Sequence, residues 1–599
     1  MKQKIQTFLS LLPDRLIKWR ISHISNKNFI ILASIVVGIT AGLAAILLKA
    51  LVHRIELFAD SFSDVKYHNY IYIFFPTLGI LLTVLFVQVF LKGKLGRGLS
   101  NVLYSVSRKN GRVHKDKTYT HIITSALTVG FGGSAGLESP IVVTGSAIGS
   151  RIGTLLQLND RERILLLACG TSAGVAAIFN SPIAGVIFAM EVLLIELTVS
   201  AFIPLLIASA TATVISKLLY NRQLFHLITY GWEYESIPIY IVLGIACGMI
   251  SAYITKTALF TEDWINAQKG IYSKALIGGL TLGLLIFLLP PLYGEGYSTI
   301  ENLLNRNYDK LLDNSLFYQF NHLPWFILLF AGILILIKVV ATSITIAAGG
   351  NGGIFATSMM TGALTGFFIS FGLNLTGLVQ IDETNFIAVG MAGILSGVIH
   401  APLTAIFLIA EITGGYFLFV PLMIVAALSY FTSRYFESYT VYTKKLAEKG
   451  HLIHKDKDKT VLGHMDMKQI LEKDFIRVLP HQSLEDIIPA IKESRRNVFP
   501  VVNADEKLLG ILTLDRIKVF LFDQDKRKSI LVSKLMNTEI PIVEIGEDMN
   551  SVIAKFEEHK VFNLAVTEGG KYKGFISKAN IFSIYRNLLI EESQPFTTI

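Results

Sequence analysis

A glycine-rich stretch between two strongly apolar segments constrains this chain more than any other feature. It reads Gly132-Gly133-Ser134-Ala135-Gly136-Leu137-Glu138-Ser139-Pro140, and a similar cluster, Gly349-Gly350-Asn351-Gly352-Gly353-Ile354-Phe355-Ala356-Thr357, begins 217 positions later. Free N–H groups and the positive dipole end at a helix start favour a bound anion. Inside a membrane, irregular backbone persists only where protein or a water-filled cavity surrounds it. The two stretches therefore predict an anion site built from broken membrane helices.

Composition places most of the chain in a lipid bilayer. Of 599 residues, 52% are hydrophobic and only 17% are charged, which is less charge than a soluble protein of this size carries. A membrane span needs about 20 apolar residues. The cleanest runs of that length are 29–48, 71–91, 275–293 and 412–430. We therefore expect a polytopic membrane protein.

The basic residues indicate which side of the membrane the chain ends occupy. Residues 1–28 combine lysines and arginines with apolar residues at helical spacing, so we expect an amphipathic helix at the cytoplasmic surface and no cleavable signal. The net charge of +9 fits positive-inside bias better than nucleic-acid binding, so the expected partner is lipid and no nucleic acid is expected. Both cysteines, Cys169 and Cys247, are interpreted as packing residues.

An internal repeat divides the apolar region. Residues 170–191 align with residues 390–411 at an offset of 220, and each copy places a glutamate, Glu191 or Glu411, nine positions after a proline. Because the glycine clusters precede these copies by nearly the same distance, two membrane halves are predicted, at 29–220 and 235–449. The second half includes a final pore-lining helix. Spacing alone leaves parallel and inverted repeats open.

The remaining residues differ in character. A charged linker over 450–467 leads to two similar soluble units, at 468–525 and 530–590. Each unit combines amphipathic helices with apolar strands, and its last strand ends in Gly-x-x-Thr or Gly-x-x-Ser. This pattern is typical of a β-α-β-β-α unit. We therefore expect a pair of cytoplasmic α/β units.

With these motifs in view, the chain resembles the CLC chloride channel and transporter family over nearly its whole length. Gly136-Leu137-Glu138-Ser139-Pro140 is similar to the family's Gly-Arg/Lys-Glu-Gly-Pro motif, and Gly353-Ile354-Phe355-Ala356-Thr357 to Gly-x-Phe-x-Pro. Gly96-Arg97-Gly98-Leu99-Ser100 is an altered form of Gly-Ser-Gly-Ile-Pro. The tail resembles a tandem pair of CBS domains, a common addition in this family.

The resemblance implies a fold, a substrate and an assembly. The fold would be an all-α polytopic membrane protein of two inverted repeats of broken and tilted helices, followed by a cytoplasmic α/β CBS pair. The substrate would be chloride and similar small anions. The assembly would be a homodimer with one pore in each subunit, and both chain ends would be cytoplasmic.

The resemblance also assigns roles to individual residues. Glu138 would be the extracellular gate, a tethered anion that competes with the permeating one; a glutamate that merely satisfies a helix dipole is the alternative. The anion-binding residues implied are Arg97, Gly136, Leu137, Gly353, Ile354, Phe355 and Tyr439. Arg97 stands where the family has a serine and could instead reach the cytoplasmic interface. Tyr442 is the alternative to Tyr439 as the inner tyrosine, and either could belong to an aromatic belt.

One position bears on the mechanism. Exchangers of the family often carry a glutamate directly after the position of Glu191, where this chain has Val192. A valine passes no proton, so a passive channel is favoured; a proton-coupled antiporter using Glu191 or Glu196 is the alternative. Glu191 and Glu411 are interpreted as residues that hold helices together. An intramembrane enzyme is a remote alternative, because His121 and His400 are isolated in the sequence.

For the tail, the resemblance suggests an adenine nucleotide as the ligand and no other cofactor. The residues at the family's nucleotide motif are Thr513, Asp515, Ser577 and Asn580. The motif's ribose-binding aspartate is replaced by Arg516 in the first unit and by Asn580 in the second. A purely structural, dimerising tail is therefore an equal expectation.

Overall fold

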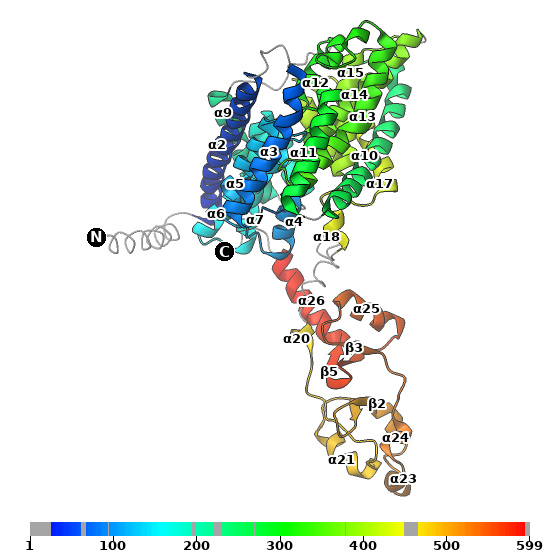
Figure 1. Ribbon diagram of the computed structural model, residues 1–599. Helices are drawn as coiled ribbons and strands as arrows, with labels where there is room; N and C mark the ends of the chain where they lie inside the picture. Colours follow the sequence, from blue (N-terminus) through cyan, green and yellow to red (C-terminus); the bar gives the residue numbers. More distant parts are fainter. Residues whose placement is uncertain are drawn as a thin grey trace, which may run out of the picture. The chain divides into compact units, whose positions relative to one another are not determined.

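The structure is a computed structural model that describes residues 25–61, 68–93, 95–96, 98–193, 199–220, 231–268, 270–377, 379–448, 465 and 467–593. The chain forms two compact units, Met1–Leu452 and Ile453–Thr598. The first is a bundle of helices and the second mixes short helices with small sheets (Figure 1). The helix expected over 1–28 lies almost entirely outside the described residues.

The first unit is helical throughout. Its α-helices in the first half are α2 (Asn26–Asp60), α3 (His68–Leu91), α4 (Gly98–Arg108), α5 (Lys117–Gly130), α6 (Glu138–Leu155), α7 (Asp160–Phe179), α8 (Pro182–Val192) and α9 (Val199–Leu219). Those in the second half are α10 (Ile237–Asn266), α11 (Ile271–Leu288), α12 (Tyr297–Leu304), α13 (Pro324–Ala347), α14 (Phe355–Thr376), α15 (Glu383–Ile399), α16 (Pro402–Ile412), α17 (Phe419–Phe436) and α18 (Lys444–Glu448). Among the described residues, 9 helices are long and apolar enough to cross a membrane.

The sequence repeat is also a structural repeat. Helix α7 ends at Asn180 with φ 55°, and α15 ends at His400 with φ 54°. This left-handed conformation stops a helix, and Pro182 and Pro402 then start α8 and α16 at a position that favours proline. Helix α6 packs against α7 as α14 packs against α15.

Two of the apolar runs differ from the expected spans. The run 412–430 is not one helix: α16 ends at Ile412, Gly414 has φ 72°, and α17 begins at Phe419. The run 275–293 stops as a helix at Leu288, shortly before two consecutive prolines. In both cases hydropathy continues where the backbone cannot remain helical.

The second unit contains two small sheets. Its elements are α20 (Met467–Ile470), α21 (Leu484–Glu493), β1 (Val498–Val502), β2 (Leu508–Thr513), α22 (Leu514–Ile517), α23 (Gln524–Ser529), α24 (Val532–Leu535), β3 (Ile542–Glu544), α25 (Met549–Glu558), β4 (Asn563–Glu568), β5 (Lys571–Ser577) and α26 (Lys578–Ser593). The order β3-α25-β4-β5-α26 confirms the expected β-α-β-β-α pattern, with β3 parallel to β4 and β4 antiparallel to β5. In the first repeat β1 and β2 are antiparallel, and the first strand is reduced to the bridge between Val478 and Val501.

Candidate anion pathway

The two glycine-rich breaks meet each other. The Gly136 amide donates to the carbonyl of Gly353 at 2.8 Å, and the Gly353 amide donates back to Gly136 at 2.8 Å. Both amides were expected to bind the anion, but here they bond the two repeats together. The helices α6 and α14 therefore start side by side, from opposite halves of the sequence.

Each break begins with a glycine in the left-handed backbone conformation. Gly132 and Gly349 adopt φ of 88° and 107°, a region that favours glycine. Asn351 links the second break to α5: its side chain donates to Thr124 at 2.7 Å and faces the His121 ring at 3.1 Å. His121, which looked isolated in the sequence, is thus part of this link between the halves.

Glu138 lies where the breaks meet. It is the first residue of α6, its side chain is 2% exposed, and Tyr297 donates a hydrogen bond to its Oε1. A Cβ atom placed on Gly136 would lie 2.1 Å from the Glu138 Oε2 and 3.1 Å from the Ala356 nitrogen. The carboxylate thus occupies the narrow space beside the first turn of α14, where an anion would meet the amides.

A loop over residues 293–297, which we call the outer loop, covers the first break. The buried Lys338 ammonium donates to the carbonyls of Leu292 and Gly294 at 3.2 and 3.1 Å, and the Gly294 amide donates to Gly132 at 3.3 Å. Glu295, in the same loop, accepts a hydrogen bond from the Leu137 amide at 3.1 Å. The outer loop therefore places two side chains, those of Glu295 and Tyr297, at the start of α6.

A cavity of about 660 Å³ adjoins the outer loop. Its lining includes several charged and polar residues around the start of α6, together with Leu137: Lys49, His53, Glu56, Leu137, Glu295, Tyr297 and Glu301. Lys49 is 9% exposed and its ammonium donates to the carbonyl of Ala177 at 3.0 Å. An anion entering the cavity would meet this cation and the Leu137 end of α6.

Tyr442 approaches the breaks from another direction. Its phenol faces the backbone amide of Ile354, and its carbonyl accepts a hydrogen bond from Ser100 at 2.8 Å. Ser100 belongs to α4, whose first residue, Gly98, lies against Ser139 of α6. The altered first motif is thus brought to the site by α4, although Arg97 itself lies outside the described residues. Tyr439, the residue expected there, is 43% exposed.

Comparison with known proteins identifies this arrangement. The family model described as "Voltage gated chloride channel" matches residues 79–434, and the CBS domain model matches 467–523 and 532–587. The chain is a member of the CLC family. Anion transport across a membrane is therefore its activity, and its apolar helices make it a multi-pass membrane protein.

The relatives of this CLC protein include exchangers and channels. It is 25% identical over 440 residues to the H(+)/Cl(-) exchange transporter ClcA of Vibrio vulnificus, covering 70% of this chain and 90% of that protein. It is 26% identical over 457 residues to the chloride channel protein CLC-f of Arabidopsis thaliana, covering 67% of this chain and 56% of that protein. The fold matches the crystal structure of a slow cyanobacterial Cl-/H+ antiporter with a TM-score of 0.61 and 21% identity, over 70% of this chain and 97% of that one.

Three other residues named in the sequence analysis of the CLC region are Phe355, Val192 and Glu196. The Phe355 ring packs against Phe179 and Phe188, with ring centroids 5.6 and 6.2 Å away. Val192 is the half-buried last residue of α8. Glu196 lies outside the described residues. Phe355 is 4% exposed, so its ring belongs to the packed interior of the helix bundle.

Glu191 and Glu411 link the short helices of the two repeats, which confirms their expected structural role. Glu191 accepts hydrogen bonds from the Leu403 and Thr404 amides at 3.3 and 2.8 Å. Glu411 accepts from the Ile183 and Ala184 amides at 3.1 and 2.9 Å. Each carboxylate thus satisfies the free amides at the start of the other repeat's short helix.

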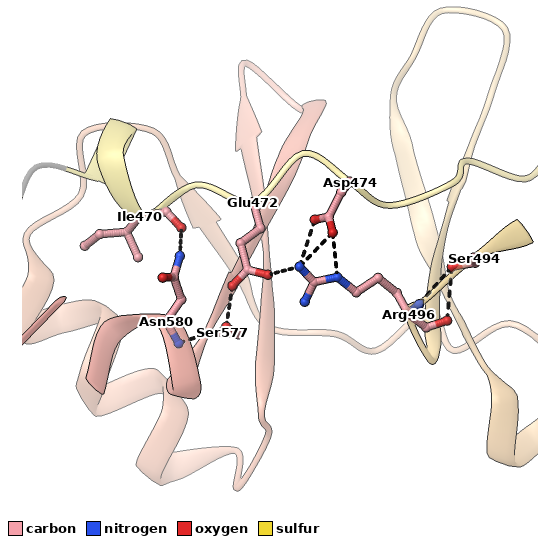
Figure 2. A network of polar contacts seen from close by, with 7 residues as sticks. All are labelled: Ile470, Glu472, Asp474, Ser494, Arg496, Ser577 and Asn580. Atoms are coloured by element: carbon pink, nitrogen blue, oxygen red, sulfur yellow. Dashed lines mark hydrogen bonds and ion pairs between the residues drawn. The ribbon is translucent and has the colours of Figure 1, made fainter. Parts of the chain in front are cut away.

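In the CBS pair an ion-pair network holds the first residues of the first unit. Arg496 donates to both carboxylate oxygens of Asp474 at 2.9 Å, and its guanidinium also lies 2.7 Å from the Glu472 carboxylate (Figure 2). Glu472 in turn accepts a hydrogen bond from Ser577 at the end of β5 (Figure 2). The network therefore connects residues of both CBS repeats.

The nucleotide-motif residues are engaged within this network or exposed. Ser577 bonds Glu472, and the Asn580 amide donates to the Ile470 carbonyl at 2.9 Å (Figure 2). Thr513 is the last residue of β2, and the Asp515 side chain is 87% exposed, 2.8 Å from the side chain of Lys518, the residue that follows α22. Because Ser577 and Asn580 already have protein partners, and Glu472 adds negative charge beside them, these residues fit an adenine nucleotide poorly.

Proposed function

We propose that this protein conducts chloride and similar small anions passively, through one pathway in each subunit of a homodimer, with Glu138 as the gate. The observation that carries the proposal is the position of the Glu138 carboxylate at the junction of the two breaks, beside the first turn of α14. An internal carboxylate at that place is a tethered substitute for the permeating anion.

Protonation provides the opening step. The ionised carboxylate is attracted to helix amides and accepts the hydrogen bond from Tyr297. A proton removes the charge and most of that attraction, so the side chain can leave and an anion can take its place. The amides of Ile354 and Phe355, at the positive end of α14, are the donors proposed for the bound anion, and Tyr442 is proposed as the inner tyrosine in place of Tyr439.

The passive mechanism is preferred to proton-coupled exchange for two reasons. Val192 carries no proton at the position where exchangers of the family often have a glutamate. The neighbouring Glu191 is bonded to two amides of α16, so releasing it for proton transport would uncap that helix. The antiporter remains the second candidate, supported by the Vibrio relative named as an exchanger.

The test is chloride flux from liposomes containing the purified full-length protein. We expect Glu138→Gln to raise flux at neutral pH about tenfold or more, because it removes a charged hydrogen-bond acceptor from the pathway, and to make activation by acid clearly weaker. An unchanged pH profile would refute the gate. A reversal potential that follows the chloride gradient alone identifies a channel, whereas a shift with the proton gradient identifies an antiporter.

The homodimer, the orientation and the tail complete the proposal. Helices α8 and α16 have 11 residues each, too short to span a bilayer, and their exposed Ile183 and Leu403 side chains suit cover by a second subunit. Positive-inside bias and the CBS pair support cytoplasmic chain ends. For the tail we propose a structural role, with an adenine nucleotide as the weaker alternative.

A further inference from the structure

A second carboxylate occupies the start of α6. Glu295 accepts the Leu137 amide at 3.1 Å, and Leu137 directly precedes Glu138. Two carboxylates therefore lie at this helix start: Glu295 accepts the Leu137 amide from the outer loop, and Glu138 is the first residue of α6. A carboxylate bonded to a free helix amide is chemically an anion bound at that amide.

Glu295 lies on the cavity side of this helix start. It lines the cavity of about 660 Å³ together with Leu137 and Tyr297, whereas Glu138 lies deeper, beside Gly136. An anion that approaches α6 through the cavity therefore reaches the amide held by Glu295 before it reaches the place held by Glu138.

The outer loop keeps Glu295 at this position. Lys338 anchors the loop through the carbonyls of Leu292 and Gly294, and Gly294 is bonded to Gly132. Because the backbone on the N-terminal side of Glu295 is fixed, release of the Leu137 amide requires only rotation of the Glu295 side chain.

Charges from several elements face Glu295. Negative charge comes from Glu138 on α6 and Glu56 on α2, and positive charge comes from Lys49 on α2 and Lys338 on α13. His53, Tyr297 and Glu301 also line the cavity. Two carboxylates that share one helix start disfavour simultaneous ionisation, while Lys49 offers the cavity a counter-charge.

We propose that Glu295 is a second gating carboxylate, which holds the Leu137 amide at the cavity end of the pathway and must release it before an anion can proceed to Glu138. This inference rests on the proposed function and adds an outer step to it. It makes acid activation steeper than a single gate would, because two carboxylates lose their hold on protonation. Glu295 should also lower the affinity for chloride that enters from the cavity side, and leave the affinity from the other side unchanged.

The experiment compares Glu295→Gly, Glu295→Gln and the control Glu301→Gln with the unchanged protein. Glu301 is an exposed residue that lines the same cavity. Chloride flux into liposomes is measured against chloride concentration and pH on each side. We expect Glu295→Gly to lower the half-saturating chloride concentration on one side only, by about tenfold, because a charged competitor for the amide is gone. Acid activation should become shallower yet persist through Glu138, and Glu301→Gln, which holds no amide of α6, should keep the steepness of acid activation of the unchanged protein.

The near-isosteric Glu295→Gln variant decides the matter if the glycine variant does not fold. It retains an acceptor for the Leu137 amide without the charge, so we expect the same shallower acid activation and a smaller change in half-saturation. Unchanged pH slope and half-saturation in Glu295→Gln would overturn the second gate, even if Glu138→Gln behaves as proposed. Absence of chloride flux in every variant and in the unchanged protein would instead overturn the proposed function.

Discussion

At the scale of single residues, the absence of one side chain makes room for another. Gly136 has ordinary backbone angles, so glycine is not required there for conformation. Its importance is steric, because a Cβ would lie 2.1 Å from the Glu138 carboxylate and 2.9 Å from the Cβ of Ala356. Gly136 is therefore the residue that lets Glu138 occupy the junction of the breaks.

We accordingly expect Gly136→Ala to displace the Glu138 side chain and to leave the pathway partly open. Chloride flux at neutral pH should rise severalfold and its acid activation should weaken, because the carboxylate is the flexible partner in the clash. Gly372→Ala is the matched control, since its Cβ would meet only ordinary contacts at 3.5 Å and beyond. If Gly136→Ala keeps the full acid activation of the unchanged protein, Glu138 does not occupy this space when the pathway is closed.

A candidate site residue could be recognised from the sequence when its signal lies in neighbouring residues, but not when its contacts come from distant parts of the chain. Glu138 could be singled out from the sequence because it lies inside its own glycine-rich stretch. Glu295 and Tyr297 were missed because they contact α6 from more than 150 positions away, a distance that no spacing pattern encodes. The available signal was local: Gly294-Glu295-Gly296-Tyr297 places an acid between two glycines directly after two prolines. The sequence left Tyr439 and Tyr442 as candidates for the inner tyrosine, and the proposal of Tyr442 uses its contact with Ile354, which no local pattern encodes.

At the scale of elements, the two repeats stabilise each other through their short helices. Helices α8 and α16 start at Pro182 and Pro402, and the residue before each proline makes no side-chain cap bond. Their free amides are satisfied instead by Glu411 and Glu191 of the opposite repeat. The cap is therefore a tertiary contact, and its loss should weaken the link between the halves as well as one helix.

We expect Glu191→Ala and Glu411→Ala each to lower the free energy of unfolding by about 1–2 kcal/mol, the range for removing a helix cap. The measurement is the thermal unfolding midpoint of the detergent-purified protein. Glu191→Gln and Glu411→Gln retain an acceptor oxygen and should lose less. Alanine variants as stable as the unchanged protein would show that water replaces these caps at no net cost.

The elements themselves were largely predictable, with informative exceptions. The repeat was readable because both halves place a proline at the start of a short helix and a glutamate nine positions later. The run 412–430 was misjudged because apolar residues continue through the Gly414-Gly415 break, and hydropathy does not register a backbone that leaves the helix. The first strand of the first CBS repeat shrinks to a single bridge, since strand length depends on pairing partners that a sequence window does not show.

At the scale of the whole molecule, a membrane unit and a CBS pair are joined in one chain. The CBS pair has an apolar cluster that includes residues of both repeats: Phe475, Val502, Leu508, Ala565, Tyr572 and Phe575. The Arg496–Asp474–Glu472 network adds polar contacts beside it. Such a pair has internal contacts sufficient to hold its repeats together without a ligand between them.

We therefore expect ATP and AMP, at millimolar concentration, to leave the thermal unfolding midpoint of the full-length protein unchanged. A ligand that binds only the folded state at a hundred times its dissociation constant would add about 2.7 kcal/mol of stability, which this measurement would detect. Glu472→Gln removes the negative charge beside Ser577 and serves as the comparison. A nucleotide-dependent rise in the unchanged protein would show that Ser577 and Asn580 exchange their present partners for the ligand.

The paired hydrogen bonds between Gly136 and Gly353 limit how this molecule can move. Transporters that work by rocking one half against the other need a seam along which the halves can slide. Here the seam is closed by two backbone bonds at the point where the two glycine-rich breaks meet. A rocking motion would have to break both bonds in every cycle, whereas rotation of side chains leaves them intact. The fold thus favours a rigid backbone in which only a few side chains rotate.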